Sequence, residues 1–182
     1  CLFLLYLRLS RYRIGFVDMR IKRYATYAAL GIVVLVGQIA LGGWTSANYA
    51  ALACTEFPVC EGDWLNRIDM AGAYSVPEAA NYEYGAHDYA ERMTMHIVHR
   101  LGAVITFLYL GWLAISLYRR SASQHLRNAS VVLALVLLAQ VGLGISNVVF
   151  SLPLQVAVLH NAVAACLLLV LVLITYTLYR KV

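Results

Sequence analysis

The chain has 182 residues, of which 62% are hydrophobic and 13% are charged. Soluble domains contain about 45–50% apolar residues, so this composition indicates a membrane protein and excludes a soluble enzyme, a nucleic-acid-binding domain and a disordered chain. The net charge of +5 does not indicate a nucleic-acid partner, because the basic residues are distributed along the chain rather than gathered in one patch.

The first part of the chain, residues 1–23, is predicted to be the remnant of a preceding helix followed by a basic cytoplasmic segment. Residues 1–7 are apolar but too short to span a membrane, and the chain opens on Cys1 rather than on an initiator Met. The rest, residues 24–182, is predicted to form one four-helix bundle. Its four apolar runs can each cross about 30 Å of hydrocarbon as a helix, and they lie at about 24–45, 93–118, 128–150 and 154–179.

The charges predict how these helices are threaded. Eleven of the fourteen Lys and Arg residues lie between Arg8 and Arg23, between 119 and 127, or after Tyr179. Basic residues concentrate in cytoplasmic segments, so we expect these segments and the C-terminus to be cytoplasmic. The loop 45–92 holds eight of the nine acidic residues, and we expect it on the outer face.

An internal repeat relates the first two helices to the last two. The first helix ends with Gln38-Ile-Ala-Leu-Gly42, and the third carries Gln140-Val-Gly-Leu-Gly144. In the second and fourth helices, Leu-Tyr-Arg follows His99 and His160 at the same spacing. Because both pairs run outward and then inward, the repeat predicts a bundle with a pseudo-twofold axis along the membrane normal.

The repeat also matches two histidines, which are costly inside a membrane and therefore point to function. His99 and His160 each lie about six residues, or about 9 Å, inside the outer end of the predicted helix. Two imidazoles at one level across a bundle can ligate a haem iron on both faces. We predict haem b, held without covalent bonds, because there is no C-x-x-C-H motif. The alternative is that each histidine donates a hydrogen bond to a neighbouring helix.

Two neighbouring arginines could meet the propionates of such a haem. Arg100 follows His99 directly, Arg92 is a second candidate, and guanidinium groups suit carboxylates. Interfacial anchoring is the alternative for both arginines. His96, one turn nearer the surface, is the alternative ligand to His99.

The outer loop is long for a connection without a function of its own, and it contains Cys54 and Cys60. On an oxidising outer face we expect them to form a disulfide that acts as a structural staple. A redox-active pair is the alternative. Glu56 and Glu61 lie between and beside the cysteines, where a carboxylate could shuttle protons, although solvated loop acids are commoner. Glu56 is the weak candidate for a catalytic residue.

Three segments carry a family resemblance, and they read G-G-W-T-S-A-N-Y-A-A-L-A-C-T-E-F-P-V-C at 42–60, H-I-V-H-R at 96–100 and L-P-L-Q-V-A-V-L-H-N at 152–161. Over about residues 24–180 the chain resembles the C-terminal half of haem A synthase, a membrane enzyme that oxidises a methyl group of haem O to the formyl group of haem A. The resemblance implies a multi-pass protein of the bacterial inner membrane.

The resemblance also implies roles for individual residues. The family's C-terminal half holds a bis-histidine haem b, and its axial ligands match His99 and His160. The family's outer-loop cysteine pair matches Cys54 and Cys60. The haem O substrate belongs to an N-terminal half that this chain lacks, so the chain alone is not expected to complete the reaction. The electron donor is not identified.

Two other functions remain open at this point. The first is a small bis-histidine b-type cytochrome that carries electrons in the membrane, because such haem sites serve many functions. The second is a copper-handling assembly protein, because residues 93–99 read M-x-M-H-x-x-H and thioether and imidazole groups bind copper.

Overall fold

The computed structural model describes residues 2–10, 21–56, 59–83 and 85–179, and these contain helices, turns and irregular segments but no strand. Four helices are long and apolar enough to cross a membrane, by length and composition. They are α2 (Tyr24–Ala47), α4 (Tyr89–Arg120), α5 (Gln124–Val149) and α6 (Leu154–Tyr179). The predictions of an all-α fold and a multi-pass membrane protein are confirmed.

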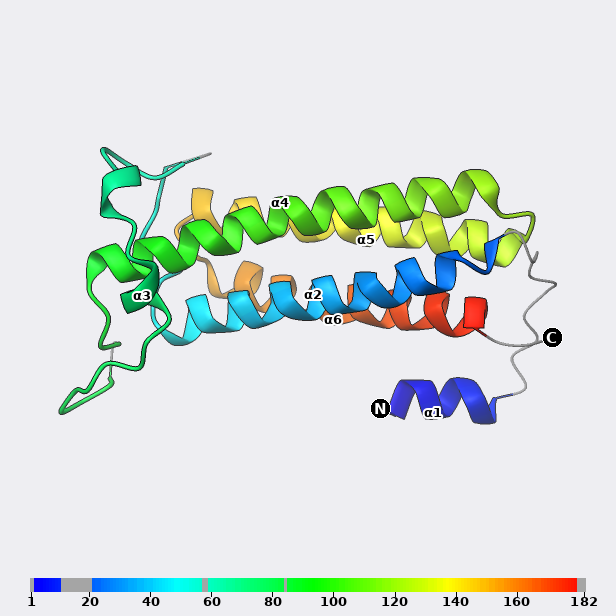
Figure 1. Cartoon of the computed structure of the whole chain (residues 1–182), viewed down its shortest axis with the longest axis horizontal. Coiled ribbons are helices and arrows are strands. Elements are labelled where there is room, and N and C mark those ends of the chain that lie inside the picture. Colours follow the sequence, from blue (N-terminus) through cyan, green and yellow to red (C-terminus); the bar gives the residue numbers. More distant parts are fainter. Residues whose placement is uncertain (1, 11–20, 57–58, 84, 180–182) are drawn as a thin grey trace.

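The four long helices form a closed bundle (Figure 1). Helix α2 packs against α4 and α6, and α5 also packs against α4 and α6. The order around the bundle is therefore α2, α4, α5, α6. It follows that α4 faces α6 across one diagonal, while α2 faces α5 across the other.

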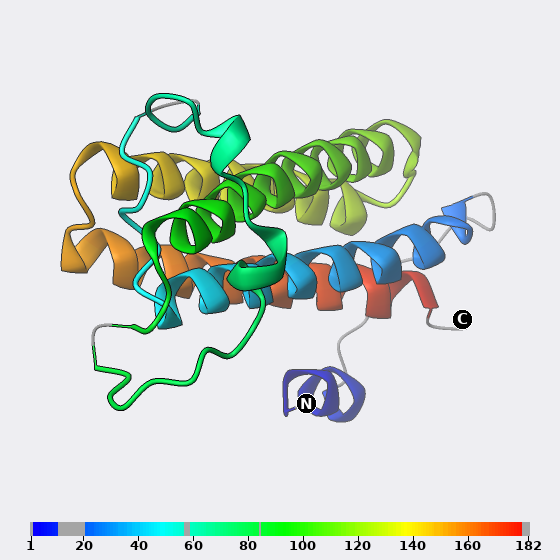
Figure 2. The same ribbon diagram turned by 60° about the vertical axis from the view of Figure 1, so that its left-hand side comes forward.

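At the end of the bundle that we predict to be the outer one, the connections within the two helix pairs differ in length. Between α2 and α4 the chain forms the long loop, with a 3₁₀ turn (Leu65–Arg67) and the short helix α3 (Met70–Ala73). Helix α3 packs against α4, and the loop gathers over the ends of α2 and α4 (Figure 2). Between α5 and α6 there is only a tight turn, in which Ser151 and Leu152 adopt positive φ. The pseudo-twofold symmetry of the whole bundle stays a prediction.

Two helices begin earlier than their apolar runs. Helix α4 starts at Tyr89 rather than near 93 because Asp88 and Glu91 form a capping box, in which each side chain accepts a hydrogen bond from the other residue's backbone N–H. Helix α5 starts at Gln124 rather than near 128. In both helices the extra turn is polar, so hydropathy alone does not detect it.

The core of the bundle lies in its inner half, which is the half next to the α4–α5 connection. Apolar side chains of all four long helices pack together there, with Leu the commonest among them. In the outer half, residues 138–166 of α5 and α6 include no buried residue. The buried core consists of Ile21, Tyr24, Ala25, Ala28, Leu35, Leu110, Leu113, Ala114, Leu117, Leu126, Leu133, Leu137, Leu167, Leu171, Ile174 and Leu178.

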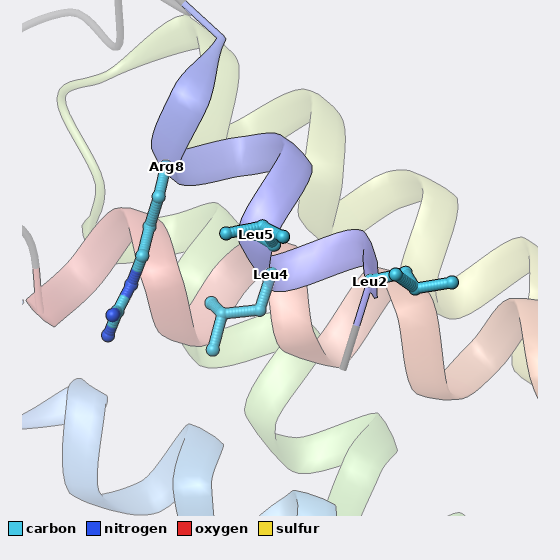
Figure 3. A pocket seen from close by; sticks show the side chains of 4 residues that line it. All are labelled: Leu2, Leu4, Leu5 and Arg8. Atoms are coloured by element: carbon cyan, nitrogen blue, oxygen red, sulfur yellow. The ribbon is translucent and has the colours of Figure 1, made fainter.

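The N-terminal helix α1 (Leu2–Leu9) lies beside the inner half of α6. The Tyr176 hydroxyl donates a hydrogen bond of 3.0 Å to the carbonyl oxygen of Leu7. The basic segment predicted to follow falls mainly on residues 11–20, which lie outside the described residues. A shallow pocket on α1 is lined by Leu2, Leu4, Leu5 and Arg8 (Figure 3). This pocket is remote from His160, because α1 contacts α6 near Tyr176 and His160 lies about 24 Å before Tyr176 along α6.

Candidate functional site

The two predicted ligand histidines lie on helices that face each other across the bundle. His99 is on α4 and His160 is on α6, and α4 and α6 lie on one diagonal of the bundle. The expectation that each lies about six residues inside its helix is wrong for His99, because the capping box extends α4 outward to Tyr89. The extra turn packs under the outer loop.

His99 is held by residues of α2. The amide nitrogen of Gln38 lies 3.0 Å from Nδ1 of the imidazole, and it also donates a hydrogen bond of 3.0 Å to the backbone carbonyl oxygen of His99. Gly42 provides the space for the ring, since a Cβ atom at this position would lie 3.0 Å from Cε1 of His99.

His160 has the equivalent neighbours on α5. The amide nitrogen of Gln140 lies 3.2 Å from Nε2 of the imidazole, and a Cβ atom at Gly144 would lie 3.2 Å from Cε1. The Nδ1 atom of His160 is buried without a hydrogen-bond partner. The glutamine and glycine of each Q-x-x-L-G motif therefore contact the histidine of their own helix pair.

The sequence analysis did not assign these contacts to the glutamines and glycines. It used Gln38, Gly42, Gln140 and Gly144 only as markers of the repeat. The signal was nevertheless present, because a polar residue and a small residue four positions apart lie on one face of a helix. Small residues allow membrane helices to approach closely, and polar ones form hydrogen bonds between helices.

Arg100 contacts the outer loop. Its guanidinium group donates hydrogen bonds of 2.7 Å to the carbonyl oxygen of Cys54 and 2.8 Å to that of Glu56. The arginine that follows His99 therefore ties the loop to α4. The contact between Arg100 and a propionate stays a prediction.

Cys54 and Cys60 form a disulfide, and Glu61 stabilises the ring that this bond closes. One carboxylate oxygen of Glu61 accepts hydrogen bonds from the Thr55 hydroxyl and from the backbone N–H groups of Thr55 and Glu56, the latter two at 3.0 and 3.1 Å. The Thr55 hydroxyl is the main reason that the pKa of Glu61 is lowered. The Glu56 side chain is exposed, and its acid–base role stays a prediction.

The methionines and His96 face the outer loop. Met93 packs against the disulfide, whereas Met95 packs in a separate cluster with Ala50 and Ala73. His96 is only 4% exposed, and its Nδ1 atom has no hydrogen-bond partner. The thioethers therefore do not converge on one site with the histidines.

Two other polar residues, His87 and Arg92, form contacts close to the start of α4. His87 Nδ1 lies 2.8 Å from the Glu91 carboxylate. Arg92 donates from Nε to the Asp88 carbonyl oxygen at 3.3 Å. Within the described ranges, no group of three or more His, Cys, Asp or Glu residues is arranged to hold a metal ion.

Comparisons with known proteins identify relatives of the chain. Residues 1–172 match the profile of a family described as cytochrome oxidase assembly protein (COX15-CtaA). A protein of Shewanella oneidensis named heme A synthase is 50% identical over 182 residues, which are 99% of this chain and 54% of that protein. No solved structure matches the chain significantly.

More distant relatives carry the same name. Heme A synthase of Mesorhizobium japonicum is 30% identical over 147 residues, which are 79% of this chain and 38% of the relative. Heme A synthase of Chelativorans sp. is 29% identical over 148 residues, which are 81% of this chain and 37% of the relative. The chain thus spans about half the length, or less, of these curated relatives.

Proposed function

The chain belongs to the cytochrome oxidase assembly protein family COX15-CtaA, and we propose that it forms the haem b-binding half of a haem A synthase. Such an enzyme is an oxidoreductase that converts the methyl group of haem O to the formyl group of haem A. The proposal rests on the matched pair of histidines, His99 on α4 and His160 on α6, each of which contacts a glutamine of the neighbouring helix.

The residues around this pair fit a haem group. The Nδ1 atom of His160 is buried without a hydrogen-bond partner, so one ring nitrogen of this histidine is available to bind iron. Residues 138–166 include no buried residue, so the α5 and α6 side of the outer half is packed less tightly than the leucine core. Two imidazoles are also the protein ligands that a six-coordinate haem needs, because the porphyrin supplies four nitrogens.

In the proposed role, His99 and His160 would hold the haem iron, and the haem would supply one-electron redox chemistry. The chain's own residues hold and enclose this group. The Gln38 and Gln140 amides contact the imidazoles, while Arg100 holds the disulfide ring against the helix that carries His99.

The substrate haem O is proposed to bind mainly to residues outside this chain, since the relatives are longer. The long cysteine-bearing loop and the names of the relatives favour this function over a simple b-type cytochrome. We also propose that the loop lies on the outer face of a bacterial inner membrane. In support, Arg119, Arg120 and Arg127 lie at the opposite end of the bundle from the loop.

The test is the absorption spectrum of the purified chain, with pyridine-haemochrome analysis of the pigment. We expect haem b and a low-spin bis-imidazole spectrum. His99→Ala or His160→Ala should abolish that spectrum, while His96→Ala, on the same helix as His99, should retain it. A chain without haem b, or a spectrum that persists in both ligand variants and disappears in His96→Ala, would contradict the proposal.

A further inference from the structure

We propose that Gln38 is a positioning residue that sets the orientation of the His99 imidazole, and that two glycines, Gly42 and Gly102, make this possible. The inference rests on the proposed function insofar as His99 is a haem ligand. Its structural part, that Gln38 fixes the ring of His99, holds for the chain with or without haem.

The Gln38 amide makes two contacts with the same residue. Its nitrogen donates to the His99 carbonyl oxygen at 3.0 Å and lies 3.0 Å from the ring nitrogen Nδ1. The bond to the carbonyl oxygen determines which end of the amide faces His99, because an oxygen there would meet another oxygen. The imidazole is thereby tied to the backbone of its own helix through a side chain of α2.

The two helices accommodate this contact reciprocally. Helix α2 has no side chain at Gly42, where the His99 ring lies, and a Cβ atom there would be 3.0 Å from Cε1 of His99. The backbone of α4 is bare at Gly102, and a Cβ atom there would overlap the Gln38 amide oxygen. Each helix therefore uses a glycine to receive the polar side chain of the other.

The second helix pair has only part of this arrangement. Gln140 and Gly144 contact His160, but the position equivalent to Gly102, three residues after the histidine, is Val163. A branched side chain replaces the bare backbone, and Gln140 approaches Nε2 rather than Nδ1. Ligation of iron through Nε2 would leave Gln38 beside His99, whereas at His160 it would require the Gln140 amide to move. We therefore expect stronger positioning at His99.

A partner on the second ring nitrogen affects a metal-bound histidine in two ways. It fixes the tautomer and rotation of the ring, and its loss typically lowers metal affinity by about 10–100-fold. An amide suits this role because it has both a donor and an acceptor. In the chain without haem, Nδ1 accepts a hydrogen bond from the Gln38 amide, so the ring proton is on Nε2. Iron bound at Nε2 would leave the proton on Nδ1, and the amide would then turn so that its oxygen accepts this proton and its bond to the His99 carbonyl oxygen is released.

The test compares variants with matched controls on the same helices. Gln38→Leu removes the amide at similar volume, and Gly102→Ala should displace the amide because a flexible side-chain end is what meets the new methyl group. Gly111→Ala on α4 and Gly43→Ala on α2 are the controls, since a Cβ atom at either position meets nothing within 4 Å.

Three measurements follow the His99 ring. In the chain without haem, ¹⁵N NMR of labelled histidine should show a changed His99 tautomer ratio in Gln38→Leu and Gly102→Ala. In the chain with haem b, the ferric EPR g values should change, and haem should bind about tenfold more weakly. Both controls should match the wild type in all three measurements.

The outcomes separate the inference from the proposed function. If the wild-type chain binds no haem b, the proposed function is wrong, while the tautomer measurement still tests the Gln38 contact. If the wild type binds haem but Gln38→Leu leaves the tautomer ratio, g values and affinity unchanged, the inference is wrong and the proposed function stands. Equal effects in the control and test alanine variants would also overturn the inference.

Discussion

Arg100 offers a direct test of what ties the outer loop to the bundle. In the structure its guanidinium group bridges two backbone carbonyl oxygens, those of Cys54 and Glu56. Arg100→Ala removes both hydrogen bonds. Arg100→Lys keeps the positive charge, but a single ammonium group lacks the planar fork that reaches two acceptors in parallel. If the contact depends on this planar fork, Arg100→Lys should recover little of the loop stability that Arg100→Ala loses.

The expected loss of free energy in Arg100→Ala follows from these two hydrogen bonds. A hydrogen bond that involves a charged group contributes about 1.5–3 kcal/mol. Arg100 is only partly buried, so we take the lower end, about 1.5 kcal/mol, for the pair together. That difference corresponds to an approximately tenfold increase in the opening equilibrium of the loop.

Amide hydrogen exchange measures this opening. Exchange at the Thr55 and Glu56 amides, which donate to Glu61, should become about tenfold faster in both Arg100 variants. Arg92→Ala is the control, since the side-chain bond of Arg92 is to a carbonyl oxygen at the start of its own helix. Unchanged exchange in Arg100→Ala, or a full return to wild-type exchange in Arg100→Lys, would refute the reasoning.

Three further predictions concern the same end of the molecule. Replacing Cys54 and Cys60 by Ser should lower the free energy of unfolding in detergent by about 2 kcal/mol, the chain-entropy value for so short a ring; an unchanged denaturant midpoint would contradict a stabilising disulfide. Because hydrogen bonds lower the pKa of Glu61, its contribution to loop stability is present above its unfolded-state pKa and is lost as the pH falls through the lower folded-state pKa. Carbon-13 NMR titration should show this low pKa, and Thr55→Val should raise it. Asp88→Ala should destabilise the first turn of α4 by about 1 kcal/mol, while Asp88→Asn preserves the cap; hydrogen exchange in that turn distinguishes the two variants.

The sequence was sufficient to predict the membrane-spanning helices, because runs of apolar residues have few other folds available to them. It was less reliable for the helix ends. The start of α4 depends on the reciprocal bonds of Asp88 and Glu91, and the apolar run begins only after them. The short helix α3 inside the loop was not predicted, since it spans only four residues and its cap is a single contact, from Gly72 N–H to the Asp69 side chain.

The candidate site was predicted in outline from matching residues in the two halves. The repeat singled out His99 and His160 as candidates, but a repeat does not specify which side chains of the neighbouring helix contact an imidazole. The bond partners of Arg100 were also beyond the sequence, because they lie 44 and 46 residues away along the chain. Such long-range contacts depend on how the loop folds back over α4.

The confinement of the leucine core to the inner half of the bundle affects how this protein can change over evolutionary time. Residues that hold the helices together and residues that contact the imidazoles occupy different stretches of the same four helices. Substitutions of core residues such as Leu133 or Leu171 can therefore alter the stability of the bundle while the histidine environment is left unchanged. Conversely, substitutions in the outer half can change the group that the bundle binds without altering the leucine core.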